Sequence, residues 1–223
     1  MKVIGINGSP KGARSQTLRL VNSVLEGARR AGADIEFLDL CKLNISYCIG
    51  CDTCHDRGRC IHEDDMGRII SKMMESEGFV LGSPVYMDAV TGQMKTFLDR
   101  LNDAVYCQSF LGKYGCAVAT TEYSGLNEVL GYLGSIMHRM GASTVGAVGA
   151  AVGLDSAAIY QADRRAFEMG RELVNAIRAK RGYPDQERTR AAFMGRMKHV
   201  IRAHREDWFH DYQYWKSMGW LED

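Results

Sequence analysis

Short apolar runs alternate with longer amphipathic segments over residues 1–180 of the chain. Five of the apolar runs have the length of buried strands, and we expect strands at residues 3–6, 35–38, 78–82, 115–121 and 144–150. Between them, apolar residues recur every three or four positions. This spacing predicts helices at residues 17–31, 64–74, 92–105, 126–140, and from an N-cap at Asp155 or Ser156 to about residue 180.

Strands that alternate with helices of this length predict a parallel sheet with helices on both faces. Five such strands match an α/β fold with a flavodoxin-like doubly wound five-stranded sheet, in the order 2-1-3-4-5. We expect one such domain at residues 1–183, interrupted by a cysteine-rich loop at residues 41–60, and an aromatic-rich, helical C-terminal extension at residues 184–223. Ligands of this architecture bind beyond the carboxyl ends of the strands, so the loops after strands one, three and four are the candidate site.

Composition and charge narrow the function classes. The chain carries 28 Lys and Arg against 27 Asp and Glu, so its net charge gives no reason to expect a nucleic acid partner. It has no apolar run near 20 residues, and it begins with a strand pattern where a signal peptide would have an apolar stretch. We therefore expect a cytoplasmic protein without a membrane partner. Because cytosolic thiols stay reduced, the seven cysteines favour metal or redox chemistry over a disulfide framework.

The loop after the first strand has the residue types of a phosphate site. Gly8 and Gly12 allow a tight turn, hydroxyl groups are frequent, and the following helix start favours an anion. The loop matches neither the Gly-x-Gly-x-x-Gly dinucleotide motif nor a P-loop, whereas a single terminal phosphate such as that of FMN fits it. The alternative is a plain helix N-cap at Ser15.

The loop after the third strand has features of a flat-ring site. Pro84 fixes the backbone direction at the strand exit, and Tyr86 can lie against a ring such as that of a flavin, whose edge the backbone amides could meet. An ordinary strand exit with a buried tyrosine is the alternative. The loop after the fourth strand would form a third wall, with Thr121 and Tyr123 near the ring edge and Gly125 permitting close approach.

These loops resemble those of NADPH-dependent FMN reductases and related flavodoxin-like proteins. The resemblance rests on Gly-Ser-Pro at residues 8–10 with Ser-Gln-Thr at 15–17, and on Ser-Pro-Val-Tyr at 83–86 with Gly-Gln-Met-Lys-Thr-Phe-Leu-Asp-Arg at 92–100. The family usually has Asn-Thr where this chain has Gln16-Thr17. The resemblance implies an FMN cofactor and a helix-packing or subunit-contact role for Asp99 and Arg100. The implied FMN contacts are Ser9, Lys11, Ser15, Gln16, Thr17, Pro84, Val85, Tyr86, Met87, Thr121 and Gly125.

Four cysteines follow the second strand with the spacing Cys-x2-Cys-x2-Cys-x5-Cys, at Cys48, Cys51, Cys54 and Cys60. Soft thiolates select iron–sulfur clusters or zinc, and this single-loop spacing suits a [4Fe–4S] cluster better than the paired arms of a zinc site. The motif resembles that of iron–sulfur flavoproteins, which implies that these four cysteines are cluster ligands. Free thiols, a redox disulfide such as Cys51–Cys54 and a lost cluster remain alternatives.

The histidines near this motif, the three other cysteines and the carboxylates after it have ordinary structural roles in our interpretation. We expect His55 and His62 at the surface, and Cys41, Cys107 and Cys116 as buried apolar side chains. Asp64 and Asp65 are expected in the first turn of a helix, where carboxylates complement the helix dipole.

Together these features predict an FMN-dependent oxidoreductase that moves electrons between a reduced donor and an acceptor. The donor would be NAD(P)H or an electron-transfer protein such as ferredoxin, and no side chain need act as an acid or base because the flavin supplies the chemistry. A cluster-free NAD(P)H-dependent FMN or quinone reductase and a non-catalytic flavin carrier or redox sensor are the alternatives. We expect a homodimer or homotetramer, with the aromatic extension docked on its own core, on a neighbouring subunit or over the flavin.

Overall fold

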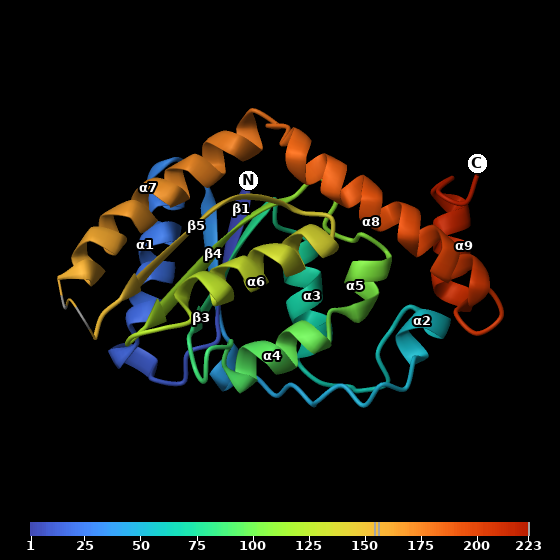
Figure 1. Ribbon diagram of the computed structural model, residues 1–223, viewed down its shortest axis with the longest axis horizontal. Coiled ribbons are helices and arrows are strands. Elements are labelled where there is room, and N and C mark those ends of the chain that lie inside the picture. The colour runs from blue at the N-terminus through green and yellow to red at the C-terminus, as the bar shows by residue number, and fades with distance from the viewer. Residues whose placement is uncertain (154, 156, 223) are drawn as a thin grey trace.

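Five parallel strands form the centre of the computed structural model, which describes residues 1–153, 155 and 157–222 (Figure 1). The strands lie in the order β2-β1-β3-β4-β5, and each neighbouring pair is parallel. This confirms the predicted fold class and strand order. The strands are β1 (Lys2–Asn7), β2 (Asp34–Asp39), β3 (Gly78–Pro84), β4 (Tyr114–Thr121) and β5 (Ser143–Ala151).

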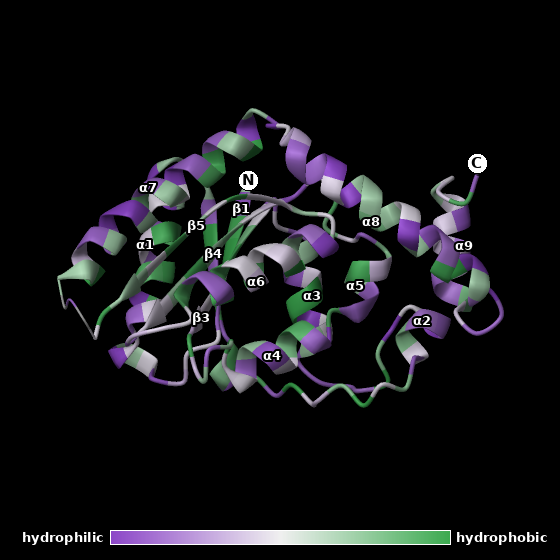
Figure 2. Ribbon diagram, in the orientation of Figure 1, coloured by the Kyte–Doolittle hydropathy of each residue, from purple (hydrophilic) through white to green (hydrophobic). Residues whose placement is uncertain are grey.

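Helices cover both faces of the sheet (Figure 1). One face carries α1 (Gln16–Arg30) and α7 (Ala158–Arg178); the other carries α3 (Met66–Met74), α4 (Gly92–Asp99) and α6 (Leu126–Arg139). Every residue of β3 and of β4 is buried, as expected for strands covered on both faces, and the central strands are largely hydrophobic green in Figure 2. The sheet is therefore a rigid base for the loops that leave its carboxyl end.

Two glycines bring α1 and α7 into backbone contact. A Cβ atom built on Gly27 would lie 1.9 Å from the carbonyl oxygen of Phe167, and one built on Gly170 would lie 1.9 Å from that of Val24. Each distance is far below van der Waals contact, so only glycine permits this approach at either position.

Two predicted helix boundaries were wrong. The helix expected at residues 92–105 is two helices, α4 and α5 (Asn102–Tyr106), because the chain turns at Arg100 and Leu101. The helix expected from residue 64 begins at Met66, so Asp64 and Asp65 precede its first turn.

The start of α7 also differs from expectation. Its N-cap is Ala157, and the Asp155 carboxylate accepts a hydrogen bond from the Ala157 amide at 2.8 Å from outside the helix. The other expected cap, Ser156, lies outside the described residues.

The segment predicted as a long cysteine-rich loop contains two short helical pieces. A single 3-10 turn spans Leu40–Lys42, and α2 spans Thr53–Arg57, in the middle of the cysteine motif. Positive φ angles at Gly50, Asp52 and Gly58 set the path of the chain around α2.

The C-terminal extension consists of α8 (Pro184–Ala203) and α9 (Phe209–Ser217). Figure 1 shows α8 as an arm that leaves the end of α7 and carries α9 to the side of α2. The Gln186 side chain anchors the start of this arm, accepting from the Thr144 amide at 2.9 Å and donating to the Thr144 carbonyl at 2.8 Å. At the far end, buried Trp215 donates to the Tyr106 carbonyl at 2.8 Å. The extension thus docks on its own core.

None of the helices in the described part of the chain is both long and apolar enough to span a bilayer.

Candidate functional site

Three loops meet beyond the carboxyl ends of β1, β3 and β4 and line one small pocket. Most of the residues expected around a cofactor line it: Ser9, Lys11, Ser15, Gln16, Thr17, Pro84, Val85, Tyr86 and Thr121. Sequence reasoning did not identify four further lining residues, Arg14, Thr120, Glu122 and Val152. Met87 and Gly125 lie outside this lining. The pocket is where a doubly wound sheet reverses its strand order, the usual ligand position in this architecture.

The first loop leaves buried polar atoms available to a ligand. Ser9 is only 1% exposed, and no group among the described residues hydrogen-bonds to its hydroxyl. The side-chain amide of Asn7, at the end of β1, is also buried and also lacks a hydrogen-bond partner among the described residues. A buried polar atom without a partner costs about 1–3 kcal/mol, so a partner supplied by a bound anion would be favourable.

The start of α1 adds further donors to the same loop. Ser15 is the N-cap and accepts a hydrogen bond from the Leu18 amide at 3.0 Å, while also lining the pocket. The first amides of a helix have no intrahelical acceptor, and they attract anions. The N-cap at Ser15, which was the alternative to a phosphate site, is therefore compatible with one.

The fourth-strand loop meets the first through a pair of threonines. The hydroxyl oxygens of Thr17 and Thr120 lie 2.6 Å apart in a buried position. The neighbouring Thr121 donates instead to the Ser124 carbonyl at 2.6 Å, within its own loop. The sequence analysis predicted Thr121 as a cofactor contact but not Thr120, because nothing local in the sequence shows that both of these adjacent threonines line the pocket.

The third-strand loop ends in a tight turn with Met87 and Asp88 at its tip. Both have positive φ, at 51° and 57°, which is costly for residues other than glycine. The Tyr86 amide donates to the Ala89 carbonyl at 2.9 Å, and the Val85 amide donates to the Thr120 carbonyl at 2.8 Å. Of the amides we expected at a flavin edge, these two are thus already used. At the turn tip, Met87 is 98% exposed.

Gly125 brings the fourth-strand loop against this turn. Its φ is 74°, and a Cβ atom there would lie 2.8 Å from both the Val85 side chain and the Asp88 carboxylate. The Asp88 carboxylate also accepts from the Ser124 hydroxyl at 2.7 Å. Gly125 therefore shapes the wall of the pocket and does not line it.

The four motif cysteines are all free thiols, and three of them are open to solvent. Cys48, Cys51 and Cys60 are exposed, whereas Cys54, on α2, is half-buried. Burial is the main cause that raises the pKa of Cys54 to about 11, although the Asn102 amide, 3.9 Å from its sulfur, opposes the shift. Cys51 has a lowered pKa because its sulfur lies 3.3 Å from the Thr53 hydroxyl.

A buried ion pair fixes both ends of the cysteine loop. Arg100, at the end of α4, donates to the Asp64 carboxylate at 2.7 and 3.1 Å and to the Ser46 carbonyl at 2.7 Å. The Asp64 carboxylate in turn accepts from the Ser46 amide at 2.9 Å. Burial alone would raise the pKa of Asp64, but the hydrogen bonds from Arg100, Ser46 and Met66 lower it to about 2. Asp64 therefore joins the two ends of the cysteine loop, whereas the sequence analysis predicted only an interaction with the helix dipole.

Two expectations for side chains near the motif were wrong. His55 is buried, at 2% exposure, with its Nδ1 2.6 Å from the Asp211 carboxylate, and its ring stacks on Trp208 at 4.1 Å between centroids. No local signal could reveal this, because both partners lie on the extension more than 150 residues later. Cys41 is exposed, whereas the expected burial of Cys107 and Cys116 is confirmed.

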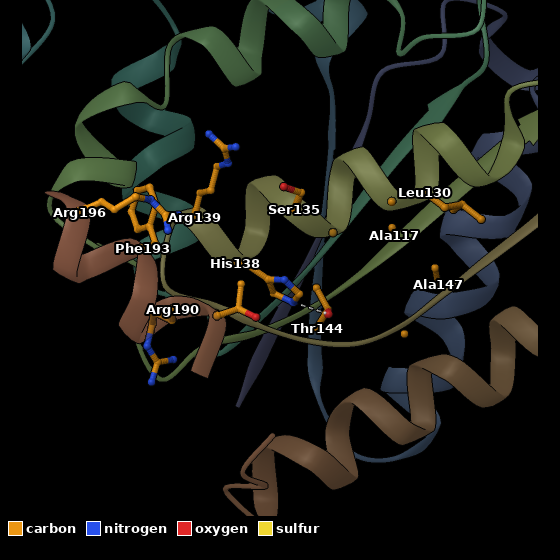
Figure 3. A pocket seen from close by; sticks show the side chains of 14 residues that line it. Ala117, Leu130, Ser135, His138, Arg139, Thr144, Ala147, Arg190, Phe193 and Arg196 are labelled. Atoms are coloured by element: carbon orange, nitrogen blue, oxygen red, sulfur yellow. Dashed lines mark hydrogen bonds between the residues drawn. The ribbon is translucent and has the colours of Figure 1, made fainter. Parts of the chain in front are cut away.

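A separate hollow lies between α6, the start of β5 and α8 (Figure 3). Arg139, Arg190 and Arg196 surround it, and His138 Nε2 lies 2.8 Å from the Thr144 hydroxyl. Burial lowers the pKa of His138. Because it adjoins the amino end of β5, this hollow is at the wrong edge of the sheet for the ligand site of a doubly wound fold.

Comparison with known proteins agrees with the geometry of the three loops. Residues 1–156 match the sequence model of the family described as NADPH-dependent FMN reductase. The chain belongs to this family. The match includes all three loops and the cysteine motif, and it makes the protein a flavin-dependent oxidoreductase.

Several relatives in this family are named iron-sulfur flavoproteins. One from Archaeoglobus fulgidus is 30% identical over 232 residues, which cover 99% of this chain and 100% of that protein. One from Clostridioides difficile is 29% identical over 189 residues, covering 82% of this chain and 83% of the relative. One from Methanocaldococcus jannaschii is 40% identical over 119 residues, covering 53% of this chain and 61% of the relative.

Solved structures with the same architecture include other members of the flavodoxin-like group. A NAD(P)H:quinone oxidoreductase from Methanothermobacter marburgensis has a TM-score of 0.62 at 15% identity, covering 78% of this chain and 98% of that one. An archaeal flavodoxin has a TM-score of 0.54 at 16% identity, covering 80% of this chain and 99% of that one. At these low sequence identities, the similarity to the solved structures shows a shared fold and nothing more.

Proposed function

We propose that the protein binds FMN in the pocket formed by the three loops. The phosphate would lie at Ser9 and the start of α1, and the ring would lie against Pro84, Val85 and Tyr86. The observation that carries this proposal is the buried Ser9 hydroxyl, which has no hydrogen-bond partner among the described residues. Lys11 and Arg14 also line the pocket and supply positive charge for a dianionic phosphate.

When bound, FMN would accept a pair of electrons from a reduced nicotinamide and pass them on together or one at a time. The protein's own residues bind and orient the ring. The turn at Met87 and Asp88 lies beside the pocket, where the exposed Met87 side chain can contact the outer part of the ring. Ser124, whose hydroxyl donates to the Asp88 carboxylate, and Gly125 keep this turn in place from the fourth-strand loop.

We further propose that Cys48, Cys51, Cys54 and Cys60 hold a [4Fe–4S] cluster that exchanges single electrons. Four free thiols on a segment fixed at both ends support this, as do the names of the relatives. A cluster-free NAD(P)H-dependent reductase is the second candidate, favoured by the raised pKa of Cys54, since its sulfur must lose a proton to become a ligand.

The remaining parts of the proposal were predicted from the sequence, and the family match also supports a nicotinamide donor. They are NAD(P)H or a ferredoxin-like protein as the donor, a homodimer or homotetramer, a cytoplasmic location, and a domain boundary at residue 183.

Ser9→Ala is expected to weaken FMN binding about 10- to 100-fold, since a hydrogen bond to a charged group contributes about 1.5–3 kcal/mol. The stability of the apoprotein should not fall, because the hydroxyl has no hydrogen-bond partner to lose in the described part of the chain. Ser15→Ala, in the same pocket, is the comparison variant: unlike Ser9→Ala, it should lower apoprotein stability by about 1 kcal/mol because it removes the α1 cap. Fluorescence titration with FMN and with riboflavin, which lacks the phosphate, measures the change in binding, and urea denaturation of the apoprotein measures the change in stability. Equal FMN affinity for wild type and Ser9→Ala would contradict the assigned phosphate position.

Cys51→Ser is expected to abolish stoichiometric iron and acid-labile sulfide while leaving FMN content unchanged, because Cys51 is not among the residues that line the flavin pocket. Cys41→Ser is the control, since Cys41 is also exposed but lies outside the motif. Both are measured on anaerobically purified protein. Full iron content in Cys51→Ser would refute its role as a ligand and support the cluster-free reductase.

A further inference from the structure

Four side chains of different chemistry converge between α5 and α9, away from the flavin loops. They are Asp103, Cys107, His210 and Asp211, and one potential ligand atom from each lies within 4.8 Å of the others. Asp103 lies in the first turn of α5 and Cys107 directly follows this short helix, whereas His210 and Asp211 are adjacent in the first turn of α9. The docking of α9 therefore creates this cluster from two distant parts of the chain.

The spacing of these atoms is that of a tetrahedral metal site. The Cys107 sulfur lies 3.7 Å from His210 Nε2, 3.7 Å from Asp211 Oδ1 and 3.8 Å from Asp103 Oδ1. His210 Nε2 lies 3.6 Å from Asp103 Oδ1. Metal–ligand distances of about 2.0–2.3 Å put the corners of a tetrahedron roughly 3.3–3.8 Å apart. These four of the six separations fall in this range, and the other two, both to Asp211, are at most 4.8 Å, so a central ion would require small side-chain movements.

The donor set selects a class of ion. A thiolate and an imidazole disfavour Mg²⁺ and Ca²⁺, which prefer oxygen ligands, whereas Zn²⁺ and similar divalent transition metals accept sulfur, nitrogen and carboxylate oxygen together. Two carboxylates and an ionised thiol would carry three negative charges, and a divalent cation would compensate most of them. Cys107 and Asp211 are buried, while Asp103 and His210 are half-buried and leave a route for the ion.

Neighbouring groups hold the four side chains in position. His55 Nδ1 lies 2.6 Å from Asp211 Oδ2, which leaves Oδ1 directed toward Cys107. The His210 ring lies against the backbone of Gly58, where an added Cβ atom would come within 2.4 Å of it. Such outer contacts fix the orientation of metal ligands in known sites.

We propose that Asp103, Cys107, His210 and Asp211 bind one divalent transition metal ion of the Zn²⁺ class, which joins α9 to α5. Binding would form four metal–ligand bonds and release the Cys107 thiol proton to solvent. Because His210 packs on Gly58 and Asp211 on His55, the ion would also fix the end of the extension against α2. The proposal does not depend on FMN or on a cluster at the cysteine motif.

The test uses Co²⁺ as a spectroscopic probe and the full-length chain with three exposed motif cysteines removed (Cys48→Ser, Cys51→Ser and Cys60→Ser). This background excludes metal binding by the motif. After chelator treatment, titration should give one Co²⁺ per chain, with a thiolate-to-cobalt charge-transfer band and the intense visible bands of tetrahedral Co²⁺.

In this background, Cys107→Ser should remove the charge-transfer band. His210→Ala should weaken Co²⁺ binding by at least about 100-fold, since even the outer partners of metal ligands contribute about 10- to 100-fold. His199→Ala, an exposed histidine on α8, is the control and should bind like its parent. Circular dichroism establishes that each variant is folded, and the half-exposed His210 is the substitution best tolerated by the fold. The absence of a thiolate band in the parent, or unchanged affinity in folded His210→Ala, would overturn the proposal.

Discussion

Arg100→Met is expected to lower the free energy of unfolding by about 3–5 kcal/mol, because it leaves the Asp64 carboxylate buried without its charged partner. The Arg100 and Asp64 side chains are only 1% and 3% exposed, and two hydrogen bonds join them. The same change frees the Ser46 carbonyl, so both ends of the cysteine loop lose an attachment. Urea denaturation measures the loss, and the iron content of the variant reports whether the loop still holds its shape.

Arg68→Met provides the matched control for this substitution. Arg68 pairs with Asp65, beside the buried pair in sequence, but its side chain is 57% exposed. Exposed pairs of this kind contribute less than about 1 kcal/mol. Similar losses in the two variants would show that the Arg100–Asp64 pair does not fix the loop.

The same pair predicts an acid-dependent loss of stability. The pKa of Asp64 is about 2 in the folded protein against an ordinary value of 3.8. A depressed carboxyl pKa stabilises the fold above the unfolded value, so this contribution is present above about pH 4 and is lost as the pH falls towards 2. The stability difference between wild type and Arg100→Met should therefore shrink over that interval.

Gly170→Ala is expected to destabilise the fold by about 3 kcal/mol or more, at the upper end of what overpacking in a core costs. The added methyl group would meet the Val24 carbonyl oxygen at 1.9 Å, and a backbone atom cannot move aside as a flexible side chain can. The helices α1 and α7 would have to separate, which also displaces the α1 start that forms the phosphate loop. Thermal or urea denaturation measures the effect.

Gly131→Ala is the control for helix propensity. Gly131 is also inside a helix, α6, but nothing lies within 4 Å of a Cβ atom built there. Alanine should leave stability unchanged or raise it by about 0.5–1 kcal/mol. A loss at Gly170 no larger than the change at Gly131 would contradict the close contact of the two helices.

The sheet and the flavin loops could be predicted because their signals are local. The run at residues 78–82 is apolar throughout, as a strand covered on both faces must be, and it became β3. The hydroxyl-rich loop around Ser9 follows directly from the first strand, so the fold alone placed it at the carboxyl edge. Turn residues, helical periodicity and strand length are each determined by a few consecutive residues, so a single sequence is enough to recognise them.

The surroundings of the cysteine motif could not be predicted, because they depend on contacts between distant segments. Arg100 lies within a helical pattern, yet its pairing with Asp64 accompanies a break between α4 and α5. His55 has the local context of a surface residue, but the extension buries it under Trp208 and beside Asp211. The aromatic composition of the extension predicted docking without indicating where.

The most direct test of the account is the composition of anaerobically purified protein. FMN, iron and acid-labile sulfide would be measured in one sample, together with the visible spectrum before and after addition of NADPH. The account predicts one FMN with about four irons and about four sulfides per chain, as a [4Fe–4S] cluster requires. Flavin without iron would contradict the cluster and leave the cluster-free reductase, whereas protein with no affinity for flavin would contradict the assignment of the three loops.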